Sequence, residues 1–172
     1  MASDALKKAA IQQRMLFRQS IYYIWGMVKS DRRDELSEKE NNFAEILMDH
    51  EEYGDHFENI EILDGREYDA GAMFNPFLHI STHQMVEDQL SANLPVQATS
   101  LYAALEGKGF SHHEAVHVIM MILVHVMHAS ALGKNPFEAA RYKRLLIKCA
   151  AAEPSEIEKI IEEDLSSYTT CH

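Results

Sequence analysis

Apolar residues recur along most of the chain at intervals of three and four, the spacing that places them on one side of an α-helix. Phe17, Ile21, Ile24 and Val28 form one such series and predict a first helix near the N-terminus. Only seven glycines and four prolines interrupt long stretches of Ala, Leu, Glu, Lys, Gln and Met, which favour helix. The pattern therefore predicts an all-α protein.

Start and stop signals divide this pattern into elements. Two sequences of the capping-box type begin at Ser37 and Ser111, and Asn75-Pro76 and Asn135-Pro136 combine an N-cap with a proline at the first helical position. They predict helices over residues 37–50, 76–92, 112–132 and 136–151, with a short one ending near residue 107. The expected fold is an antiparallel bundle of about six to seven helices, with one long irregular loop around residues 51–74.

The length of 172 residues suits one helical domain over residues 1–172, with its core in 38–150. Charged residues are unevenly distributed along the chain. A basic N-terminal helix is expected over 3–30 and an acidic C-terminal helix over 154–166. Both charge clusters are explained by helix faces exposed to solvent.

Composition and charge argue against two classes of partner and indicate a cellular location. The net charge of −11 argues against nucleic acid, because phosphate binding requires basic clusters. The longest strongly apolar run, Val118–Val124, is too short to cross a bilayer, so no membrane association is expected. Two distant cysteines and an N-terminus without an apolar signal segment indicate a cytoplasmic protein. A small molecule or oxygen is a candidate ligand, and a homo-oligomer is a candidate assembly.

Histidine is the most informative residue type. Nine of the ten histidines fall between His50 and His128. His79 with His83, and His113 with His117, are spaced four apart, so each pair lies on one helix face and can reach a single ion.

Both pairs lie on the apolar, inward-facing side of their predicted helices. Two such pairs can face each other across a bundle core, which is where carboxylate–histidine metal sites are built. Glu87 lies one turn beyond His83 and can supply a carboxylate. The predicted metal ligands are His79, His83, Glu87, His113 and His117, with His50 or His56 as additional ligands from the start of the loop.

His113–His117 also reads H-E-x-x-H, the pattern of zinc hydrolases in which the glutamate activates a zinc-bound water. Glu114, however, is three residues after Ser111, the capping-box position at which its carboxylate accepts from the helix start. A catalytic role for Glu114 therefore applies only if the protein is a hydrolase.

Ligand spacing is similar in part to that of hemerythrin-like di-iron bundles. His83 with Glu87, His113 with His117, and His50 with Asp55 resemble the histidine and carboxylate pairs of that family, in permuted order. The resemblance implies iron, with two ions in an oxygen-handling or redox centre. Imidazole ligands suit zinc equally well.

Two sequence segments resemble a bacterial domain-of-unknown-function family. They are FNPFLHISTHQMVEDQL, with its NPFLH-x-x-x-H helix, and HHEAVHVIMM, with its HEA-x-H helix. A third segment, around His50 and Tyr53, resembles the family's His-x-Glu-Tyr, with His56 displaced. The resemblance covers roughly residues 42–144 and implies a helical, metal-binding protein.

The sequence thus predicts a histidine-rich, metal-binding helical protein. The metal is non-haem iron or zinc, and the site holds one ion or two. An H-E-x-x-H zinc hydrolase is one alternative. The other is a non-catalytic interaction or scaffold protein whose histidines are structural or hold one structural zinc.

Overall fold

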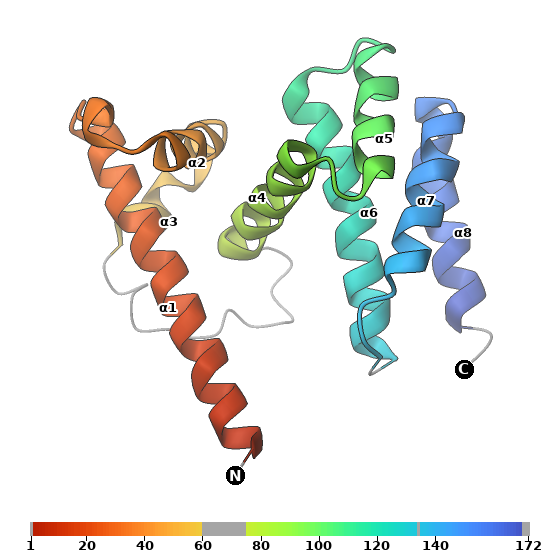
Figure 1. Ribbon diagram of the computed structural model, residues 1–172, viewed down its shortest axis with the longest axis horizontal. Helices are drawn as coiled ribbons and strands as arrows, with labels where there is room; N and C mark the ends of the chain where they lie inside the picture. Colours follow the sequence, from red (N-terminus) through yellow and green to blue (C-terminus); the bar gives the residue numbers. More distant parts are fainter. Residues whose placement is uncertain (1, 60–74, 134, 170–172) are drawn as a thin grey trace. The chain divides into compact units, whose positions relative to one another are not determined.

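The computed structural model describes residues 2–59, 75–133 and 135–169. Eight α-helices and several short 3-10 turns make up the regular structure of these residues (Figure 1). The prediction of an all-α helical bundle is confirmed, while the antiparallel order stays a prediction. The chain divides into two compact units, Met1–Ser81 and Thr82–His172, a division that was not predicted from the sequence.

The first unit contains α1 (Ala2–Lys29), α2 (Glu38–Met48) and α3 (Gly54–Glu58), with 3-10 turns η1 (Arg33–Glu35) and η2 (Glu51–Tyr53). Its core is built from one face of α1 and residues of the other elements. Buried side chains there include Ile21, Trp25, Leu47, Phe57 and Ile80. The capping box at Ser37 is present, because the Glu40 carboxylate accepts from the Ser37 N–H at 2.9 Å.

The predicted irregular loop around 51–74 is wrong over its first eight residues, which form η2 and α3. Packing against α1 explains this short helix. A Cβ at Gly54 would lie 3.1 Å from the Trp25 ring, and the buried Phe57 ring meets Trp25 edge-on at 5.5 Å. Five residues are too few for a helical period to be visible in the sequence. Residues 60–74 lie outside the described residues.

Helix α4 (Pro76–Ala92) has the bounds that the sequence predicts. Asn75 caps it, since its side-chain oxygen accepts from the N–H groups of Phe77 and Leu78, both at 3.1 Å. Asn93, with a φ of 52°, follows its end. Phe77 and Ile80 belong to the first core, and Val86 belongs to the second.

The second unit is completed by α5 (Val96–Glu106), α6 (His112–Leu132), α7 (Ala139–Ala151), the 3-10 turn η4 (Pro154–Glu156) and α8 (Ile157–Thr169). Helices α6 and α7 lie at its centre, because each contacts α5, α8 and the other. The predicted helix start at Asn135-Pro136 is wrong, since α7 begins at Ala139. The Asn135 N–H instead donates to the Ser130 carbonyl at 2.9 Å and so closes the end of α6.

Helix α6 is also the most apolar element. Its residues 112–131 are long and apolar enough to cross a membrane, with a mean hydropathy of 1.5, and half of this stretch is buried inside the protein. The core helix of a soluble bundle has the same composition. Ala115, Val116, Ile119, Ile122 and Val126 account for much of its buried face.

Candidate metal centre

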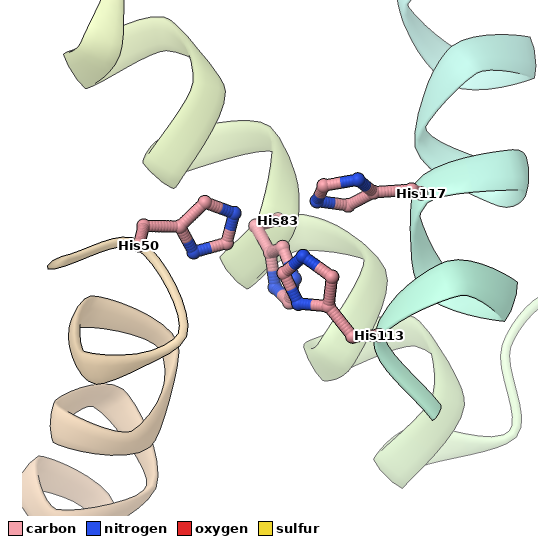
Figure 2. A group of neighbouring side chains, drawn as sticks. All are labelled: His50, His83, His113 and His117. Carbon is pink, nitrogen blue, oxygen red and sulfur yellow. The ribbon is translucent and has the colours of Figure 1, made fainter. Parts of the chain in front are cut away.

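Three histidines of the second unit come together between α4 and α6. His83 on α4 is buried, with 1% of its surface exposed, while His113 and His117 stand one turn apart on α6 and are half-buried. Their ring centroids are 4.1 Å apart for His113 and His117, and 5.5 Å for His83 to each of the others. Figure 2 shows these three imidazoles directed into the space between the two helices.

The spacing of these rings suits a metal ion. Each of the three residues offers a ring nitrogen, and these nitrogens lie within 4.8 Å of one another. Nitrogens around a tetrahedral zinc ion are roughly 3.3 Å apart, given Zn–N bonds of about 2.0–2.1 Å. Small side-chain rotations would close the difference. The donor set is neutral imidazole, which suits zinc, iron, copper or nickel.

The predicted carboxylate, Glu87, lies beside this group. One turn after His83 on α4, its Oε1 is 3.8 Å from His83 Nδ1. The same oxygen is 2.8 Å from His112 Nε2, which donates to it. Glu87 therefore has a hydrogen-bond partner on α6 and lies beside the His83 ring.

His112 was not selected from the sequence, because it lies at the start of the predicted helix and off its apolar face. In the structure 52% of its side chain is exposed. Its other nitrogen, Nδ1, is 2.8 Å from the Tyr102 hydroxyl on α5. The Tyr102 hydroxyl donates its single proton to Glu106 at 2.8 Å, so its oxygen is the acceptor towards His112 Nδ1. Burial, with the nearby Glu106, raises the pKa of Tyr102 to about 12, so the phenol stays protonated at neutral pH. No spacing in the sequence brings Tyr102, His112 and Glu87 together, since they lie on three different helices.

Glu114 is held at the start of α6. Its Oε2 accepts from both the N–H and the hydroxyl of Ser111 at 2.8 Å, and Ser111 Oγ accepts in return from the Glu114 N–H. These bonds from Ser111 lower the pKa of the Glu114 carboxyl. A general base working near neutral pH needs a raised pKa and a position facing the reacting water. The geometry of Glu114 is that of a helix cap.

The other predicted ligands belong to the first unit. His50, with 1% of its surface exposed, and His79 at the start of α4 face each other with their Nε2 atoms 2.8 Å apart. The Tyr53 ring stacks on His50 at 5.7 Å and meets His79 edge-on at 5.6 Å. His56 on α3 is exposed. The structure thus brings together His83, His113 and His117 in one unit and His50 with His79 in the other.

Comparison of the sequence with known protein families gives a match over most of the chain. A family model described as a domain of unknown function (DUF1841) matches residues 13–148. No curated protein and no solved structure shows a significant match. The matched span contains the whole of α2 to α6 and both histidine groups, and it includes both segments on which the sequence resemblance rests. The chain therefore belongs to the DUF1841 family.

Proposed function

We propose that this protein binds a divalent transition-metal ion, with His83, His113 and His117 as its core ligands. The observation that carries the proposal is the approach of three ring nitrogens to within 4.8 Å of one another on two helices of one unit. Three imidazoles leave coordination positions for water, oxygen or a small substrate. Such a centre can activate a bound water if the ion is zinc, or handle oxygen if it is iron.

Iron and zinc are the two ions we propose. A di-iron centre requires carboxylates that bridge or bind the ions, as in carboxylate–histidine bundles. Among the described residues, the closely grouped donors in the second unit are imidazoles, and this favours a single ion. The capping role of Glu114 gives no support to a hydrolase of the H-E-x-x-H type.

The proposed setting is the reducing cytoplasm. Cys149 is buried in the second core, and burial raises the pKa of its thiol to about 11. The group is therefore a protonated thiol at neutral pH, a form that resists oxidation.

The experiment is metal analysis and titration of protein purified without a histidine tag. We expect one zinc or iron ion per chain, or uptake of one Zn²⁺ or Fe²⁺ by chelator-treated protein. His117→Ala and His113→Ala should weaken binding by more than about 100-fold, beyond the range typical of outer residues. His128→Ala is the matched control, because this exposed histidine stands on the same helix.

Two results would overturn the proposal. One is wild-type protein that takes up no transition metal on titration. The other is a folded His117→Ala variant that binds metal as tightly as His128→Ala. Circular dichroism of each metal-free variant establishes that it is folded.

A further inference from the structure

Glu87, His112 and Tyr102 form a connected hydrogen-bonded chain on the outer side of the proposed metal centre. The chain runs from the Tyr102 hydroxyl to His112 Nδ1, and from His112 Nε2 to Glu87 Oε1, with both distances 2.8 Å. It ends 3.8 Å from His83 Nδ1. Three helices, α4, α5 and α6, each contribute one residue to it.

The direction of this chain decides what Glu87 can do. A carboxylate only accepts hydrogen bonds, and one oxygen of Glu87 already accepts from His112. The same oxygen is the one nearest to His83 Nδ1. A carboxylate beside the Nδ1 of an imidazole favours the tautomer with the proton on Nδ1, which leaves Nε2 with the lone pair for a metal.

We propose that Glu87 is a positioning residue that orients His83 from outside the metal centre, and that His112 and Tyr102 hold the Glu87 carboxylate in place. This inference rests on the proposed function. It makes Glu87 a neighbour of the ligand His83, whereas the sequence pattern predicts that Glu87 is itself a metal ligand. Carboxylate–histidine–metal arrangements set both ligand geometry and metal affinity through a hydrogen bond, which here requires the 3.8 Å between Glu87 Oε1 and His83 Nδ1 to shorten by roughly 1 Å when the metal binds.

The partial exposure of the chain supports the same assignment. Glu87 has 23% of its side chain exposed and His112 has 52%, whereas His83 has 1%. The carboxylate therefore lies at the edge of the unit and the imidazole inside it. Holding a carboxylate at such an edge requires a fixed partner, and His112 and Tyr102 supply one.

The test compares Co²⁺ and Zn²⁺ binding by wild-type protein and three variants. Glu87→Gln should weaken Zn²⁺ binding by about 10–100-fold and shift the visible absorption bands of the Co²⁺ form. His112→Ala should act in the same direction, and Tyr102→Phe should have a smaller effect. A combined Glu87→Gln/His112→Ala variant should be little worse than Glu87→Gln alone, because both changes disable one chain.

Asp88→Asn is the matched control. Asp88 is the next residue on α4 and is exposed, and it accepts from Gln84 at 2.9 Å. This variant removes the same charge and should leave both the affinity and the Co²⁺ spectrum unchanged.

X-ray absorption of the Zn²⁺ forms distinguishes positioning from direct coordination. Wild-type protein and Glu87→Gln should show the same number of nitrogen and oxygen ligands. Loss of one ligand in Glu87→Gln would overturn the proposal, as would an affinity and spectrum equal to those of Asp88→Asn. If wild-type protein binds no metal, the proposed function fails. If it binds metal and Glu87→Gln behaves as wild type, only the positioning role fails.

Discussion

A single hydrogen bond can fix the tautomer of a buried imidazole. His50 illustrates this in the first unit. Its Nδ1 lies 2.7 Å from the Ile46 carbonyl, which can only accept, so Nδ1 carries the proton. In a neutral ring the lone pair is then on Nε2. His79 Nε2 lies 2.8 Å from this nitrogen and therefore donates to it, so the His50 ring is held by hydrogen bonds at both nitrogens.

The sequence-based prediction that His50 or His56 is an additional ligand stays a prediction, but their different burial in the first unit supports a stability test. We expect His50→Ala to lower the free energy of unfolding by roughly 1–3 kcal/mol, because it removes a buried ring that is hydrogen-bonded to the Ile46 carbonyl. His56→Ala should cost little, since this side chain is exposed. Urea unfolding of both variants measures the difference. Equal stabilities for the two variants would contradict the expectation.

At the scale of elements, helix starts follow from local side-chain chemistry. The caps at Ser37, Asn75 and Ser111 are all present, because each involves residues within three positions of one another. Signals that compete with tertiary contacts are less dependable. Asn135 has the same sequence signature as Asn75, yet its backbone N–H completes the end of the preceding helix.

The capping box of α2 should make stability depend on pH. Hydrogen bonds from Ser37 hold the pKa of the Glu40 carboxyl below its ordinary value of 4.5. A carboxyl whose pKa is lower in the folded state stabilises the fold above the unfolded pKa, and this contribution is lost as pH falls through the folded pKa. We expect Glu40→Gln to be less stable than wild type at pH 7 and to approach it at pH 3.

Urea unfolding followed by circular dichroism at the two pH values measures this difference. Glu38→Gln serves as the control, because Glu38 is an exposed residue of the same first turn outside the capping box. A stability difference from wild type that is the same for Glu40→Gln at both pH values would contradict the prediction.

At the scale of the whole molecule, the second unit is held together by more than its apolar core. Arg141 on α7, with 3% of its surface exposed, donates from Nε to Asp164 Oδ2 on α8 at 2.7 Å. His125 on α6 lies 3.2 Å from the same oxygen. One carboxylate therefore joins three helices, at the opposite part of α6 from His113 and His117.

We expect Asp164→Ala to lower the free energy of unfolding by roughly 3 kcal/mol, because it leaves the buried Arg141 guanidinium without this carboxylate. Glu163→Ala should cost little, since this exposed residue faces Lys159 at 3.9 Å on the surface of α8. Chemical denaturation of both variants tests this. A loss for Asp164→Ala no larger than that for Glu163→Ala would show that the network contributes little.

Metal removal should also lower stability. A ligand that binds only the folded state, at a free concentration of 100 times its Kd, adds about 2.7 kcal/mol. We expect a chelator to lower the melting temperature of the protein, and stoichiometric Zn²⁺ or Fe²⁺ to restore it. His117→Ala should melt at the same temperature with and without metal. A chelator effect of equal size in this variant would place the stabilising ion elsewhere.

Local spacing in the sequence by itself determined the helices and their caps, and it put His83, His113 and His117 on inward faces. These features depend on residues within about four positions of one another, which the helical period encodes. Tertiary structure alone decided which side chains meet across helices. The pairing of Glu87 with His112, the anchor at Tyr102, the α3 helix against Trp25 and the two units all depend on packing between distant segments. No local period encodes such contacts, because the turns and core contacts that create them lie outside any single helix.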